Sequence, residues 1–90
     1  MAAENPRKPI RLSTHAAEQC VERGATEDEV RYAILHGTRE SAKHGRWLFR
    51  HNFQYNSRWQ GRLYAIKQVS PVVAETEDEI VVVTVYTFFF

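Results

Sequence analysis

The sequence predicts an α+β fold in which an N-terminal two-helix hairpin packs on an antiparallel sheet of three to four strands. Two observations carry this prediction. Apolar residues recur with helical spacing between capping residues up to Gly37, and beyond it they alternate as they do in strands. The chain has 90 residues, enough for one domain with a small core, so we expect any active site to be a shallow groove.

Residues 1–9 are polar and contain two prolines, so we expect a flexible arm in front of a single domain over residues 10–90. The only cysteine, Cys20, has no partner for an intramolecular disulfide. The start lacks the apolar stretch of a signal peptide, and no apolar run has the length of a membrane span. These features favour a cytoplasmic protein without membrane contact.

Capping residues define the two expected helices. Ser13 or Thr14 can cap the first helix, and Gly24 can end it in a left-handed conformation. Thr26 and Glu29 have the spacing of a capping box for the second helix. On a helical wheel the apolar stripe of the first helix consists of Ala16, Ala17, Cys20 and Val21. The core-facing residues of the second helix are Val30, Ala33 and Ile34.

The strands follow the helices. The segment RWLFRHNFQY alternates between a mainly aromatic and a mainly polar face. We expect a turn at Asn56–Gly61 and a strand from Arg62 to about Val69, with Pro71 at an edge or a bulge. Ile80 to about Phe88 is the most apolar strand and is expected in the middle of the sheet, while residues 10–12 are a candidate edge strand.

The charge distribution points to nucleic acid, although the formal net charge is only +1. No Asp or Glu occurs from Ser41 to Ala74, where basic and aromatic side chains alternate. This mixture suits phosphate contact and base stacking. The alternative is that the aromatic residues form the core of a sheet and the basic residues its solvated face. The candidate nucleic-acid contacts are Lys43, Arg50, His51, Arg58 and Lys67.

The stretches IRLSTHAAEQCVERGATEDEVRYAI, GRWLFR, GRLYAI and EIVVVTVY, in this order, resemble a family of small bacterial and phage domains of unknown function. That family is similar to the RelE, ParE and BrnT toxins and, more broadly, to barnase-like and colicin-like ribonucleases. The resemblance implies a metal-independent endoribonuclease, the toxin of a toxin–antitoxin system, which cleaves RNA by attack of the 2′-hydroxyl.

Such cleavage needs a proton acceptor, a proton donor and cations around the phosphate. His15 lies in a first helical turn, where the macrodipole favours its neutral form. Arg23 follows about 12 Å along the axis, so the two could only border one groove. The resemblance implies that Arg46 and Arg62, which follow glycines, clamp the phosphate and that Tyr86 donates to it. Each also fits a structural role: a capping histidine, a helix-end or solvated arginine, a core tyrosine.

Partners and alternatives follow from the remaining features. The histidines and Cys20 lack metal-ligand spacing, and there is no phosphate-binding glycine loop, so no metal and no cofactor is expected. His44 is expected in a loop. The apolar Phe88–Phe90 end predicts an acidic antitoxin or a second copy of the chain along the C-terminal strand. RNA, free or on the ribosome, is the expected substrate; the alternative is a nucleic-acid-binding or protein-interaction module that does not cleave.

Overall fold

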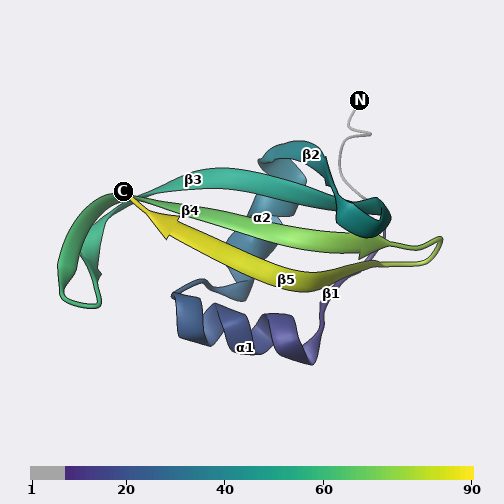
Figure 1. The fold of residues 1–90 in the computed structure, drawn as a ribbon, viewed down its shortest axis with the longest axis horizontal. Helices are drawn as coiled ribbons and strands as arrows, with labels where there is room; N and C mark the ends of the chain where they lie inside the picture. Colours follow the sequence, from purple (N-terminus) through teal and green to yellow (C-terminus); the bar gives the residue numbers. More distant parts are fainter. Residues whose placement is uncertain (1–7) are drawn as a thin grey trace.

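In a computed structural model that describes residues 8–90, two helices lie against one side of a five-stranded sheet (Figure 1). The elements in chain order are β1 (Ile10–Leu12), α1 (Thr14–Arg23), α2 (Glu27–His36), β2 (Thr38–Ala42), the 3-10 turn η1 (Lys43–Gly45), β3 (Arg46–Trp59), β4 (Arg62–Glu75) and β5 (Ile80–Phe89). The sheet order is β1-β5-β4-β3-β2. β1 pairs with β5 in parallel, and the other neighbours are antiparallel.

The α+β class with N-terminal helices is therefore confirmed, but the sheet is mixed and has five strands instead of three to four antiparallel ones. β2 was not expected because its sequence, TRESA, has no apolar alternation, and most of the strand is exposed. It pairs only with the first five residues of β3. Such an edge strand is specified by backbone pairing rather than by burial.

The middle strand is β4, which corrects the expectation that Ile80–Phe88 lies there. β4 contains Pro71, whose missing N–H is a liability in a central strand. The pairing of β3 with β4 passes from Leu48–Val72 to His51–Val69 without a pair at Pro71, and the β4–β5 register shifts after Val72. These irregularities accommodate the proline inside the sheet. Of the two predicted positions for Pro71, an edge or a bulge, the structure therefore shows the second.

The β3–β4 hairpin turns later than expected. Asn56 has φ 46° and lies in a register shift within β3, whereas the turn consists of Gln60 and Gly61, with φ 52° and 84°. Two positive φ values are typical of the tight turns that match strand twist. The hairpin curls back toward the helices (Figure 1), and Trp59 covers Gly24, where an added Cβ would lie 2.8 Å from the indole.

The helix caps are confirmed, because Ser13 Oγ accepts from the Ala16 N–H and Thr26 and Glu29 form the capping box. The expected apolar stripe of α1 is partly wrong, since Ala17 is exposed and Val21 is 83% exposed. Gln19, which does not belong to that expected stripe, is buried.

The physical reason is that α1 runs along the outer edge of β5. There Gln19 Oε1 accepts from the Val85 N–H at 2.8 Å, and Arg23 Nη1 donates to the Val85 carbonyl at 2.9 Å. The sheet edge at Val85 is thus already hydrogen-bonded within the chain. A partner that adds a strand there must displace both side chains.

The core lies between the helices and one face of the sheet. It is built from Ala16, Cys20, Ala25, Val30, Ile34, Val69, Val73, Ile80, Val82 and Val85. The opposite side, here called the open face, carries residues that alternate with the core residues along the strands. The open face consists of Arg46, Leu48, Arg50 and Asn52 of β3, Gln68, Ser70 and Val72 of β4, and Thr84, Tyr86 and Phe88 of β5.

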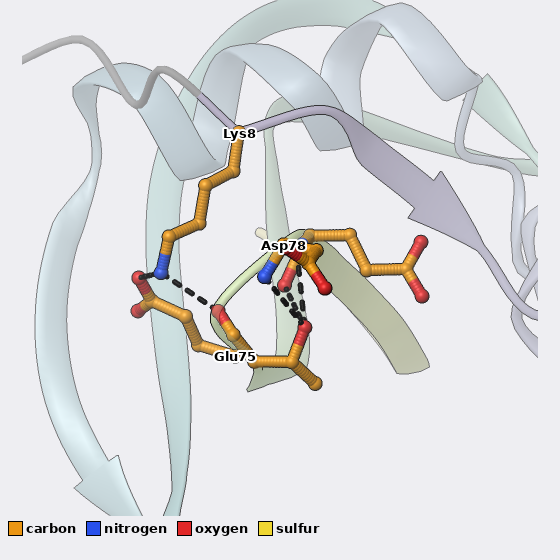
Figure 2. Close-up of polar contacts among 5 residues, drawn as sticks. Lys8, Glu75 and Asp78 are labelled. Atoms are coloured by element: carbon orange, nitrogen blue, oxygen red, sulfur yellow. Dashed lines mark hydrogen bonds and ion pairs between the residues drawn. The ribbon is translucent and has the colours of Figure 1, made fainter.

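Most of the expected N-terminal arm lies outside the described residues, but its end is held in place. Figure 2 shows the Lys8 ammonium at the β4–β5 turn, where it pairs with the Glu75 carboxylate at 2.7 Å and donates to the Thr76 carbonyl. Pro9 accepts a backbone hydrogen bond from Ile80. Within residues 8–90, neither helix is long and apolar enough to cross a membrane.

Candidate functional site

Tyr86 lies on the open face at the edge of β5, where α1 and the sheet meet. Its side chain is 44% exposed, and the guanidinium carbon of Arg23 lies 5.5 Å from the ring centroid. Arg23 is held over the ring by its bond to the Val85 carbonyl, and Thr87 Oγ1 donates to the Arg23 carbonyl at 2.7 Å. The end of α1 is therefore fixed, so the cation stays beside Tyr86 in a cation–π contact.

A hollow of about 290 Å³ lies where the end of α1 meets Tyr86, and we call it the edge hollow. Glu22 and Arg23 of α1 line it together with Trp59 at the end of β3. It thus presents a carboxylate and a guanidinium next to a tyrosine. A carboxylate can accept a proton, and a guanidinium can hold a phosphate with two parallel hydrogen bonds.

A second hollow of about 290 Å³ lies over the open face and shares Tyr86 with the first; we call it the face hollow. Its basic lining comes from η1 and the start of β3, with Lys43, His44 and Arg46. His44 has φ 63° and Gly45 φ 70°, and this left-handed pair places η1 between β2 and β3. None of the residues that line the face hollow is acidic, so its field favours an anion.

Next to these hollows the open face carries a polar network. Arg50 Nε donates to Glu40 at 2.9 Å, and Arg50 Nη1 donates to Gln68 Oε1 at 3.1 Å. Gln68 Nε2 in turn donates to Asn52 Oδ1 at 2.8 Å. The network fixes the amide and guanidinium planes, and Glu40 offsets the charge of Arg50. Arg50 is therefore a weaker anion ligand than the cations of the face hollow.

The five sequence-predicted catalytic residues do not all meet. Arg23, Arg46 and Tyr86 line the two hollows, with Tyr86 common to both. His15 is exposed in the first turn of α1, and Arg62 is exposed where β4 starts after the hairpin turn. Neither side chain lines the edge hollow or the face hollow. Arg23 and Arg46 line different hollows, which have Tyr86 in common, and His15 lines neither of them.

The predicted nucleic-acid contacts divide in the same way. Lys43 is exposed at the face hollow, and Arg58 is exposed at the hairpin turn, where it donates to a backbone carbonyl. His51 points to the helix side of the sheet, with its ring 4.9 Å from that of Tyr32. Arg50 belongs to the polar network described above.

Lys67, a predicted nucleic-acid contact, lies in the interior of the fold. It is 6% exposed, and its ammonium donates to Glu29 and to the Gly24 carbonyl, both at 2.8 Å. The same ammonium lies 5.2 Å from the ring centroid of Tyr55. Lys67 therefore joins β4 to the start of α2, and its charge is used inside the fold. The period-2 pattern placed it on a strand but could not show which face the helices cover.

Sequence reasoning missed two residues of the site, Glu22 and His44. Glu22 is one of two exposed carboxylates on α1, and nothing in its spacing relates it to Tyr86. His44 was expected in an ordinary loop, and only the left-handed turn before β3 brings it to the face hollow. Within residues 8–90 no three His, Cys, Asp or Glu side chains lie close enough to hold a metal ion.

Comparison with known proteins gives a family but no characterised relative. Residues 12–87 match the family described as Domain of unknown function (DUF4258). No curated protein and no solved structure matches the chain significantly. The matched segment runs from the end of β1 to Thr87, so it contains both helices and every residue of the two hollows except Phe89. The chain belongs to this family of domains of unknown function.

Proposed function

We propose that the domain is a metal-independent endoribonuclease that holds the scissile phosphodiester beside Tyr86, between the edge hollow and the face hollow. The observation that carries the proposal is the position of Tyr86, which lines both hollows: the edge hollow with Arg23 and Glu22, and the face hollow with Lys43, Arg46 and His44. Arg23 comes from a helix and Arg46 from a strand, and each lines one of the two hollows that share Tyr86. Two cations can stabilise the charge that builds up on the phosphoryl oxygens.

The proton transfers are assigned to Glu22 and His44, one in each hollow. In-line displacement requires the attacking and leaving oxygens on opposite sides of the phosphorus atom. Glu22 accepts the proton of the 2′-hydroxyl, whose oxygen forms the new bond to phosphorus and closes a 2′,3′-cyclic phosphate. The bond to the 5′-oxygen breaks, and protonated His44 donates its proton to that oxygen. Tyr86 donates a hydrogen bond to a non-bridging oxygen.

Cleavage of a mixed RNA in EDTA, with the product ends mapped, tests this proposal. We expect 2′,3′-cyclic phosphate ends, and we expect Glu22→Gln and His44→Ala each to slow cleavage by about 10²- to 10⁴-fold, the usual contribution of a general acid or base. Arg31→Ala is the control, because Arg31 is a partly exposed arginine that pairs with Glu27 on α2 and lines neither hollow. Intact RNA with the wild-type protein contradicts the proposal.

The roles of the individual residues are tested in the same assay. If His15→Ala abolished cleavage while Glu22→Gln did not, the proton acceptor would be His15, as the sequence suggested. Tyr86→Phe keeps the ring under Arg23 and removes only the hydroxyl. We expect this variant to lower the rate at saturating RNA while leaving RNA affinity unchanged.

A second candidate is a domain that binds RNA without cleaving it. It is favoured by Arg23, which already donates to the Val85 carbonyl and so has fewer donors free for a reacting phosphate. This candidate predicts salt-dependent RNA binding with no product in EDTA, and binding that Arg46→Ala weakens at low salt. Product formation decides between the two.

We further propose that the enzyme acts as a toxin and that an acidic antitoxin covers the open face, since the domain's own helices leave that face uncovered. Expression in a bacterial host is expected to arrest growth, and Glu22→Gln to relieve the arrest. Arrest that persists at full strength in that variant would point to target inhibition without cleavage.

A further inference from the structure

We infer that Tyr86, Phe88 and Phe90 form a stacking platform for the bases of an extended single strand, so that the substrate of the proposed site is single-stranded RNA and not a duplex. The position of the cut is taken from the proposed function. The stacking platform itself is inferred from a separate observation, the exposure of three aromatic side chains. Three aromatic side chains at alternate positions near the end of the chain are exposed, by 44%, 43% and 62%. Exposed aromatic rings in a row are typical of a binding surface.

The rings have the geometry of separate stacking positions. The centroids of Tyr86 and Phe88 lie 6.5 Å apart, and their planes differ by 24°. This distance is about twice the rise of roughly 3.4 Å between neighbouring bases in a duplex strand. Two adjacent bases that each stack on one ring must therefore be drawn apart. A single strand can stretch in this way, whereas a duplex cannot without losing its own stacking.

Phe89 lies between Phe88 and Phe90 in the chain, and its packing shows that these two exposed rings belong to an ordered end of the chain. Its ring stacks on Trp59 at 5.3 Å with planes 12° apart and contacts Tyr55 and Tyr64 on the helix side. The backbone of Phe90 is hydrogen-bonded to Ile66. The end of β5 is therefore a fixed strand, and its alternation holds Phe88 and Phe90 on the outer side.

The polar neighbours favour binding with little sequence preference. Ser70 and Gln68 are the cross-strand partners of Tyr86 and Phe88. The amide of Gln68 is already engaged, because its oxygen accepts from Arg50 and its nitrogen donates to Asn52. Few free groups remain to read base edges, so affinity comes from ring stacking and from the cations beside Tyr86. This combination is typical of single-strand binding that tolerates any sequence.

Charge favours a nucleic acid over an apolar protein segment as the occupant. The row of rings begins at Tyr86, the residue shared by the two cation-lined hollows, so a strand whose phosphate lies there can place its next bases on Phe88 and Phe90. An apolar protein segment would cover the rings but would bring no anion to Arg23, Lys43 and Arg46.

The test is the affinity of the full chain for a short fluorescent oligodeoxynucleotide, single-stranded or annealed to its complement, at one fixed salt concentration. DNA lacks the 2′-hydroxyl and cannot be cut by the proposed chemistry, so binding is measured apart from catalysis. We expect the single strand to bind at least about tenfold more tightly than the duplex. We expect Phe88→Leu to weaken single-strand binding by about 5- to 100-fold, the effect of losing one stacked base.

Two variants separate stacking from other causes. Phe88→Trp keeps an aromatic surface and is expected to bind as well as the wild type or better, whereas Phe88→Leu keeps only apolar bulk. Val21→Ala removes an exposed apolar side chain from α1 and serves as the control, with unchanged affinity expected. Circular dichroism of each variant verifies that the fold is intact.

Equal affinity for single strand and duplex, or equal binding by Phe88→Leu and Phe88→Trp, overturns the inference. So does sedimentation that shows a dimer which Phe88→Leu dissociates, because the rings would then bind a second copy. Failure of the proposed cleavage has a different signature: RNA would stay intact while the single-strand preference and the effect of Phe88→Leu persisted. RNA cleavage without any preference for single strands would retain the proposed function and remove only this inference.

Discussion

Replacement of Gln19 by alanine tests how α1 is joined to the sheet. Gln19 is 6% exposed, and its Oε1 accepts the N–H of Val85, a residue with no exposed surface, at 2.8 Å. Truncation leaves that N–H buried without a partner, which costs about 1–3 kcal/mol. For a domain of this size, each kcal/mol lowers the melting temperature by about 4–8 °C, so we expect a decrease of roughly 4–24 °C.

The matched variant is Val21→Ala, two residues further along the same helix. Val21 is 83% exposed, so its truncation should change the free energy of unfolding by no more than about 0.5 kcal/mol. An apolar stripe read from the sequence predicts the reverse ranking, with Val21 in the core and Gln19 in solvent. Thermal and urea unfolding followed by circular dichroism measure both variants. A larger loss of stability in Val21→Ala than in Gln19→Ala would refute the edge arrangement of α1.

Three further predictions concern buried and paired groups. Lys67→Met removes the cation that faces Glu29 in a largely buried pair, so it should lower the free energy of unfolding by roughly 3 kcal/mol in urea titrations; an unchanged midpoint would contradict the buried pair. Burial raises the pKa of the Cys20 thiol, so iodoacetamide at mildly alkaline pH should alkylate the folded protein far more slowly than the protein in urea, and equal rates would mean an accessible thiol. The hydrogen bond from Arg11 lowers the pKa of the Glu79 carboxyl, so this pair stabilises the fold at neutral pH and the contribution disappears as the pH falls through the lowered pKa. Glu79→Gln should therefore be slightly less stable than the wild type at neutral pH and equally stable in acid, as a pH series of unfolding curves would show.

Local signals predicted the helices, because each helix end depends on residues close in the chain. Ser13, Gly24 and the Thr26–Glu29 capping box act within one helical turn, and the structure confirms them. The buried face of α1 depends on its neighbour instead. The N–H and C=O groups of a buried sheet edge need hydrogen-bond partners, and α1 supplies them. Gln19 is therefore buried, although a helical wheel expects only apolar residues on a buried face.

The sheet and the site depend on pairings between distant segments, which periodicity does not contain. The alternation in β3 is visible in the sequence, but β2 lacks it, and Pro71 predicts an edge or a bulge without showing that its strand lies in the middle of the sheet. The contact of Arg23 with Tyr86 joins residues more than sixty positions apart. Basic residues were recognisable from sequence, but only the fold separates Lys43 at the face hollow from Lys67 in the interior.

The proposed function depends above all on a phosphodiester binding on the open face beside Tyr86. The most direct measurement is the change in backbone amide NMR signals when a short DNA strand that cannot be cleaved is added to the labelled protein. If the phosphodiester binds there, the signals of His44, Arg46 and Tyr86 move together and saturate with the strand, while those of the exposed start of α1 around His15 stay in place. Shifts confined to His15 and the solvent side of the helices would contradict it.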